Sequence, residues 1–208
     1  MKSYFTTILL SLLVLISCSQ EHKHEGKKED SCCKNETTHS KEKSTDDQGS
    51  FYDISGLTYT NHLGKAQSLS DMKGKYVFVS MIFTQCKYAC PKIAENIQAL
   101  ESALNKPFQV VLISFDPKRD NPQTMSAFLN EKKAGKNWTV MTSTDDIIRK
   151  SSMLFDISFK ELENGDFSHE NVIIVLDKQG REIKRIEGLN INVQQEATEI
   201  LDLLGKEA

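Results

Sequence analysis

The sequence predicts an α/β fold in which a central mixed β-sheet is flanked by helices, and three stretches of the chain support this. Residues 76–83 form an apolar run with β-branched and aromatic residues, which predicts a strand buried on both faces. Residues 108–115 predict a second buried strand of the same kind. Residues 172–176 and 182–187 flank a short turn that contains Gly180, which predicts a β-hairpin.

The other predicted elements follow from helix caps and from apolar residues at helical or extended spacing. They are, in chain order, an extended section at 52–69, a helix with Pro91 at its first position, a helix capped by Asn121, a short strand at 138–141, a helix capped by Thr144 and a terminal helix from Asn192 to Gly205. A βαβ start followed by a hairpin and a terminal helix is the order of the thioredoxin fold. We therefore expect a thioredoxin-like fold with an N-terminal extended or β-hairpin addition.

The start of the chain is typical of an exported lipoprotein. An apolar run from Ile8 to Ile16 is too short to span a bilayer as a permanent helix, so residues 1–17 predict a signal peptide. The segment that ends at Cys18 resembles a bacterial lipobox, and Cys18 is therefore expected to be lipidated. An ordinary secretory signal with an incidental cysteine is the alternative. The lipoprotein interpretation predicts an extracytoplasmic, membrane-anchored protein of the cell envelope, on the periplasmic face.

Residues 18–50 are predicted to be a disordered tether. From Ser19 to Ser50 there is no Leu, Ile, Val, Met or aromatic residue, so the segment cannot bury enough apolar surface to fold. The tether contains several potential metal ligands, namely His22, His24, His39, Cys32 and Cys33. They suit either a weak metal-scavenging arm or a solvated linker with incidental ligands. The linker is favoured because no spacing in the segment defines a closed site.

Residues 51–208 suit a single domain with a core of its own. The formal net charge of the full chain, −3, gives no argument for a nucleic-acid partner. Of the five cysteines in the chain, only Cys86 and Cys90 fall in this domain. A disulfide that closes so short a loop stabilises a fold little, so we interpret the pair as functional rather than structural.

The two cysteines predict either a redox couple or a metal site. They lie between a strand and a helix, and the helix dipole favours the thiolate form near its N-terminus. Thioredoxin-type motifs place two residues between their cysteines, whereas Cys86 and Cys90 have three between them. This spacing allows a disulfide and also lets two thiolates converge on one metal ion.

A third ligand would have to come from elsewhere in the domain, which has two histidines. His62 lies in a polar turn and is expected to be a solvated surface residue. His169 is expected in a loop just before the hairpin strand, beside the cysteine turn of a thioredoxin fold, which favours a metal ligand over the alternative of an ordinary surface histidine. Two thiolates and one imidazole suit copper, whereas zinc usually has a fourth ligand in a closed site.

Three features together resemble the Sco/SenC family of copper chaperones. They are Thr84-x-Cys86-x-x-x-Cys90-Pro91, the segment Ser114-Phe115-Asp116-Pro117-x-Arg119-Asp120-x-Pro122, and a single His169 ahead of the hairpin. Family members are membrane-tethered thioredoxin-fold proteins that assist assembly of the binuclear copper (CuA) site of cytochrome c oxidase. The resemblance implies that Cys86, Cys90 and His169 bind copper, as Cu+ or Cu2+, and that Asp116 is an acidic residue near the site. A strand-ending turn is the alternative role for Asp116.

The resemblance also implies partners: the cytochrome c oxidase subunit that carries the CuA site, other copper donors or thiol reductases, and the membrane through the lipid anchor. Two departures from the family pattern, Lys87-Tyr88 after the first cysteine and the neighbours of His169, keep a second function open. This alternative is an extracytoplasmic thiol–disulfide oxidoreductase in which Cys86 attacks and Cys90 resolves. A peroxiredoxin-like peroxidase is supported only by the fold and a thiol. Copper binding should require His169, whereas thiol–disulfide exchange should not.

Overall fold

The computed structural model describes residues 49–205, and these contain a seven-stranded mixed sheet. The predicted signal peptide, Cys18 and the cysteines and histidines of the predicted tether lie outside the described residues. The boundary between tether and domain therefore stays a prediction. No helix of the described part is long and apolar enough to cross a membrane.

Parallel strands occupy the middle of the sheet and antiparallel strands its two sides. The strands of this sheet are β1 (Tyr59–Asn61), β2 (Ala66–Gln67), β3 (Tyr76–Ile82), β4 (Phe108–Ser114), β5 (Trp138–Thr142), β8 (Val172–Leu176) and β9 (Glu182–Glu187). Their order across the sheet is β2-β1-β5-β4-β3-β8-β9, with β3, β4 and β5 parallel and the other neighbouring pairs antiparallel. The carboxyl ends of β3 and β4 consequently meet at one edge, where ligands commonly bind in open α/β sheets.

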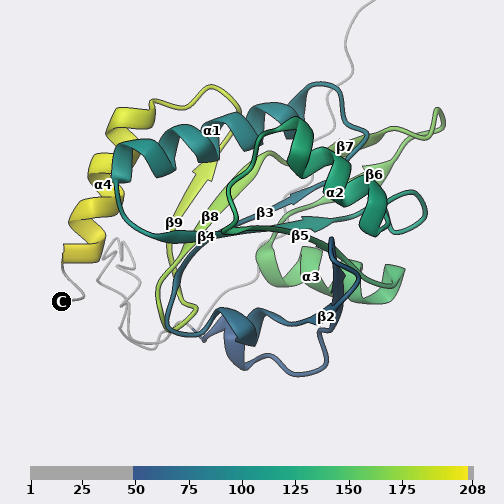
Figure 1. Ribbon diagram of the computed structural model, residues 1–208, viewed down its shortest axis with the longest axis horizontal. Coiled ribbons are helices and arrows are strands. Elements are labelled where there is room, and N and C mark those ends of the chain that lie inside the picture. Colours follow the sequence, from purple (N-terminus) through teal and green to yellow (C-terminus); the bar gives the residue numbers. More distant parts are fainter. Residues whose placement is uncertain (1–48, 206–208) are drawn as a thin grey trace, which may run out of the picture. The chain divides into compact units, whose positions relative to one another are not determined.

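Helices cover both faces of the sheet (Figure 1). The helices are α1 (Ala89–Leu104), α2 (Pro122–Glu131), α3 (Asp145–Phe155) and α4 (Val193–Gly205), together with the short 3₁₀ helices η2 (Phe51–Asp53) and η3 (Leu69–Met72). Helices α1, α2 and α4 lie on one side of the sheet and α3 on the other (Figure 1). The predicted thioredoxin-like α/β fold, including the N-terminal hairpin addition formed by β1 and β2, is confirmed.

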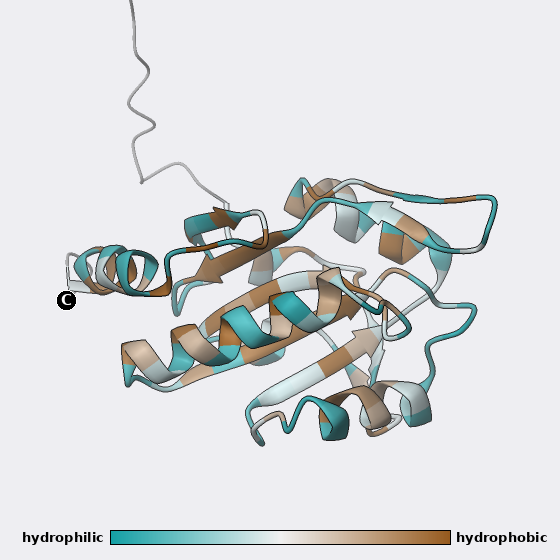
Figure 2. Cartoon of the chain, turned by 90° about the horizontal axis from the view of Figure 1, so that it is seen from above, coloured by the Kyte–Doolittle hydropathy of each residue, from teal (hydrophilic) through white to brown (hydrophobic). Residues whose placement is uncertain are grey.

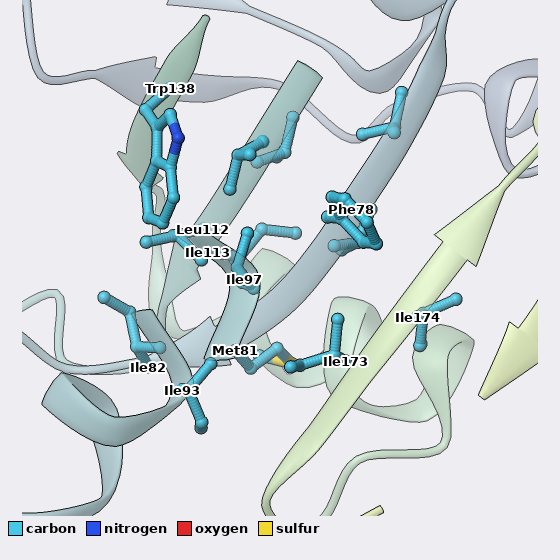
Figure 3. Close-up of a cluster of buried hydrophobic side chains, with 14 of the residues drawn as sticks. Phe78, Met81, Ile82, Ile93, Ile97, Leu112, Ile113, Trp138, Ile173 and Ile174 are labelled. Atoms are coloured by element: carbon cyan, nitrogen blue, oxygen red, sulfur yellow. The ribbon is translucent and has the colours of Figure 1, made fainter. Parts of the chain in front are cut away.

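The core forms where the apolar side of α1 meets the central strands. Figure 2 shows that the middle of the sheet is hydrophobic, whereas α1 carries both hydrophilic and hydrophobic residues. Ile93 and Ile97 are fully buried and lie beside Ile82 and Leu112 of the sheet (Figure 3). Burial of such side chains is worth about 1.5–3 kcal/mol each. This packing fixes the start of α1, and with it Cys90, relative to the end of β3.

Two local predictions were wrong in detail. Helix α1 begins at Ala89, so Pro91 is its third residue rather than its first. Proline is tolerated there because the first N–H groups of a helix have no partner within the helix. The segment at 51–53 is a 3₁₀ helix rather than extended chain, since the Ser50 side chain accepts a hydrogen bond from the N–H of Tyr52.

The turn between β8 and β9 requires glycine at Gly180. Its φ is +82°, and a Cβ atom there would lie 2.5 Å from the Tyr52 ring. Gly188 has a similar φ, +84°, but a Cβ atom there would meet no heavy atom within 4 Å. The two glycines therefore differ in the space around them rather than in backbone conformation.

We predict that Gly180→Ala destabilises the protein more than Gly188→Ala. The left-handed backbone costs an alanine about 1–2 kcal/mol at either position. Overpacking against Tyr52 adds about 1–3 kcal/mol at Gly180 alone. Urea unfolding of the two variants measures the difference, and equal losses would contradict the packing that we describe.

Candidate metal centre

The two cysteines lie where β3 passes into α1. Cys86 is in the connecting loop and is partly buried, whereas Cys90 is in the first turn of α1 and is completely buried. The N–H of Phe83 donates a hydrogen bond to Sγ of Cys90 (3.5 Å), and the N–H of Cys90 donates to Sγ of Cys86 (3.4 Å). Backbone donors thus face both sulfur atoms, which favours negative charge on them.

Asp120 holds this loop to the end of β4. Its carboxylate, on a residue only 3% exposed, accepts hydrogen bonds from the N–H of Thr84 (2.9 Å), the hydroxyl of Thr84 and the hydroxyl of Ser114. A buried carboxylate with several donors forms strong, charge-assisted bonds. Asp120 therefore positions the chain two residues before Cys86. Sequence reasoning gave it no role, and its only signal was its place in the Asp-Pro-x-Arg-Asp segment.

His169 belongs to a small hairpin rather than to a loop. Strands β6 (Phe159–Glu161) and β7 (Phe167–His169) form a separate two-stranded sheet, in which Phe159 pairs with His169. The predicted loop at this position was thus wrong. Asn164-Gly165 in the connecting turn was a usable hairpin signal, because this dipeptide favours such turns.

The hairpin rests on aromatic rings from the end of the main sheet. Phe115 lies 4.9 Å from Phe159 and 5.1 Å from Phe167, measured between ring centroids, and Phe83 lies 5.1 Å from Phe167. We call Phe83, Phe115, Phe159 and Phe167 the aromatic cluster. The ring of His169 contacts it as well, at 5.1 Å from Phe115. The cluster brings the imidazole to the cysteines.

Cys86, Cys90 and His169 form a potential three-ligand site. One ligand atom of each lies within 4.8 Å of the other two, and Nε2 of His169 is 3.8 Å from Sγ of Cys90. Nδ1 of His169 lies 3.0 Å from the backbone carbonyl of Glu170. Because a carbonyl only accepts, the neutral imidazole carries its proton on Nδ1, and Nε2 offers its lone pair on the side of the sulfurs.

The surroundings shift the pKa values of the two thiols in opposite directions. Hydrogen bonding to the Cys90 side chain, with help from His169, lowers the pKa of Cys86 to about 3 despite partial burial. Burial raises the pKa of Cys90 well above its usual range, and the neighbouring Cys86 adds to the effect. Burial alone would lower the pKa of His169, but hydrogen bonding to Cys86 and to the carbonyl of Glu170 outweighs burial and raises it. Cys86 is therefore the thiolate, and Cys90 a protonated thiol, in the metal-free protein.

Asp116 and His62, which were also considered from the sequence, are not members of this group among the described residues. Asp116 is buried and forms an ion pair with Arg119, and burial raises the pKa of its carboxyl group. Among the described residues it is not a member of the three-ligand group, so its role near the site stays a prediction. His62 is partly buried rather than solvated, and burial lowers its pKa.

Comparison with known proteins decides the family. The family model of SCO1/SenC matches residues 47–205. The chain belongs to the SCO1/SenC family. The SCO1 protein homolog of Bacillus subtilis (strain 168) is 26% identical over 145 residues, which are 66% of this chain and 75% of that protein.

Solved structures of the family are similar to this SCO1/SenC chain in fold. A SCO1/SenC family lipoprotein from Bacillus anthracis is 26% identical, with a TM-score of 0.66 over 73% of this chain and 95% of that one. ScoI of Bradyrhizobium japonicum, solved with copper bound, is 25% identical, with a TM-score of 0.57 over 72% of this chain and 96% of that one. The resemblance inferred from the sequence motifs is thereby confirmed.

We predict that Cys86 reacts with iodoacetamide almost equally fast at pH 8 and pH 5.5. A pKa of about 3 leaves Cys86 fully ionised across this range. For an ordinary cysteine, with a pKa of about 8.5, the fraction in the thiolate form falls roughly a few hundred-fold between pH 8 and pH 5.5. Cys90 should react slowly throughout because it is buried.

Mass spectrometry of the reduced full chain measures the labelling of each cysteine. Cys32 and Cys33 provide reference thiols in the same sample. A fall in Cys86 labelling that parallels the fall at Cys32 and Cys33 would contradict the pKa assigned to Cys86.

Proposed function

We propose that the protein is a copper chaperone that binds the metal through Cys86, Cys90 and His169. The observation that carries this proposal is the convergence of two sulfurs and one imidazole nitrogen within 4.8 Å of one another. Soft thiolate ligands select Cu+, and imidazole also suits copper. Membership of the SCO1/SenC family and a relative solved with copper bound support the same metal.

The number of ligands favours copper over zinc. In the part of the chain that the structure describes, the group has three members, and none of them is a carboxylate. Structural zinc sites are almost always four-coordinate, whereas Cu+ accepts lower coordination. The carbonyl of Glu170 accepts a hydrogen bond from Nδ1 of His169 and so fixes the orientation of the ring. Metal-binding histidines usually donate their second ring N–H to such a partner.

Binding and release are coupled to protons and to the redox state of the sulfurs. Copper would bind the Cys86 thiolate first, because Cys90 must lose a proton before it acts as a ligand. Both sulfurs must be reduced, since a disulfide removes the two thiolates. Delivery would proceed by ligand exchange, with ligands of the acceptor replacing Cys86, Cys90 and His169 in turn.

We propose that the acceptor is the cytochrome c oxidase subunit that carries the CuA site. Family membership supports this partner. A lipid on Cys18 would hold the protein on the periplasmic face of a membrane in the cell envelope, and the described lipoprotein relative supports this location. Residues 18–50 would then serve as the tether between anchor and domain, and 51–208 as the copper-carrying domain.

A thiol–disulfide oxidoreductase is the second candidate, and the contrast between the two thiols favours it. Cys86 is a partly buried thiolate of low pKa, and Cys90 is a fully buried thiol of raised pKa. In this function Cys86 attacks one sulfur of a substrate disulfide, and the other substrate sulfur leaves as a thiolate. Cys90, after losing its proton, attacks Sγ of Cys86, which releases the reduced substrate and leaves a Cys86–Cys90 disulfide.

We predict that His169→Ala weakens Cu+ binding by at least about tenfold. Loss of a residue that only hydrogen-bonds to a metal ligand typically costs about tenfold in affinity, and His169 is itself a ligand in this proposal. His62→Ala is the matched control, since His62 is the other histidine of the described residues and is not part of the group. The affinity is measured by competition with a chromogenic Cu+ chelator. The reduced full chain should carry Cys32→Ser and Cys33→Ser in every variant, so that the tether thiols do not bind the metal.

The two candidate functions give opposite results in this experiment. For the copper chaperone, His169→Ala lowers the affinity and His62→Ala does not. An affinity that both substitutions leave unchanged would count against the chaperone and leave the dithiol function in place. Reduction of a model disulfide by the same variants measures that second function directly.

A further inference from the structure

The position of His169 depends on side-chain packing rather than on backbone pairing with the main sheet. Strands β6 and β7 pair only with each other among the described strands. An isolated two-stranded hairpin is at best marginally stable in water. Phe167 and His169 are two residues apart on β7, so their side chains lie on the same face of the hairpin. Whatever holds Phe167 therefore also holds His169.

Arg119 lies against this part of the hairpin. Its Nε donates to the carboxylate of Asp116, which is only 2% exposed. The guanidinium carbon of Arg119 is 5.8 Å from the ring centroid of Phe83 and 5.5 Å from that of Phe167. These distances are within the range of cation–π attraction. One side chain thus contacts both the loop that leads to Cys86 and the strand that ends at His169.

We propose that Arg119 is a positioning residue that holds the imidazole of His169 at the two sulfurs through cation–π contacts with Phe83 and Phe167. The inference rests on the proposed function, in which His169 is a copper ligand. The buried carboxylate of Asp116 pairs with the guanidinium of Arg119. Asp116 would therefore act at the site indirectly, through Arg119. Arg119 contacts none of the three ligands through any hydrogen bond that we observe in the described part of the chain.

The planar shape of the arginine side chain is essential to this role. Nη2 of Arg119 is buried and has no hydrogen-bond partner among the described residues. The guanidinium is therefore held by Asp116 and by the faces of the two rings. Lysine carries the same charge but is a compact, strongly hydrated point charge, so its single nitrogen cannot pair with Asp116 and contact both rings as the broad guanidinium does. Arg119→Lys consequently tests the contacts with the two rings without removing the positive charge beside Asp116.

The test is a double-mutant cycle on Cu+ affinity in the reduced full chain with Cys32→Ser and Cys33→Ser. Arg119→Lys is expected to weaken binding about tenfold, as is typical when a ligand loses an outer support. In a His169→Ala background the same substitution should change the affinity less than twofold, because the group that Arg119 positions is gone. Equal losses in both backgrounds would overturn the proposal. An unchanged affinity in both would do so as well.

Arg181→Lys is a closely matched control. Arg181 also pairs through Nε with a buried carboxylate, that of Asp177, and its side chain is 36% exposed against 35% for Arg119. It lies in the turn between β8 and β9, at the opposite end of β3 from the cysteines. Its replacement should leave Cu+ affinity within twofold of the wild type even if it costs stability. Phe167→Leu, which removes one ring beneath the guanidinium, should reproduce the effect of Arg119→Lys.

A second readout uses the reduced protein without copper. The ring of His169 lies close to Phe115 and Phe83, and aromatic rings displace the NMR resonances of nearby nuclei. In Arg119→Lys the ring resonances of His169 should move toward those of an exposed histidine, and in Arg181→Lys they should stay in place. Resonances that do not move in Arg119→Lys would overturn the positioning role. If wild type and His169→Ala bind copper equally, the proposed function fails, and the resonances alone decide the role of Arg119.

Discussion

The candidate site depends on the packing of the β6–β7 hairpin against the end of the main sheet. The two cysteines are fixed by the start of α1, but the third donor arrives from a hairpin that shares no backbone pairing with the main sheet. The aromatic cluster and Arg119 are central to the contact between these two parts, which also includes the ion pair of Lys118 with Glu161. Aromatic pairs of this kind contribute about 0.5–1.5 kcal/mol each beyond the area that they bury. The geometry of the site is therefore a property of tertiary packing.

The two sulfurs differ because the fold buries Cys86 only partly and Cys90 completely. Asp120 holds the loop before Cys86 to the end of β4, and Cys90 lies completely buried in the first turn of α1. The result is one thiolate that is charged before a metal ion arrives and one thiol that must give up its proton. This contrast would serve capture and release of a metal ion, and it would equally serve thiol–disulfide exchange. His169 is the feature that distinguishes the two functions.

Much of the fold could be predicted because its signals are local. The apolar run at 76–83, the cysteine spacing and the cap at Asn121 each involve neighbouring residues, and the structure contains the corresponding strand, loop and helix. The β6–β7 hairpin was missed because its strands are short and only partly buried, so they lack a continuous apolar pattern. The roles of Asp120 and Arg119 could not be predicted, since they depend on contacts between segments that only the folded chain brings together. The choice of His169 depended on its place before the hairpin and on the family resemblance.

X-ray absorption spectroscopy of the reduced, copper-loaded full chain with Cys32→Ser and Cys33→Ser tests the central claim most directly. The account predicts a copper ion bound by two sulfurs and one imidazole nitrogen, and loss of the nitrogen contribution in His169→Ala. A copper ion bound by sulfur alone, with the same spectrum in wild type and in His169→Ala, would contradict it.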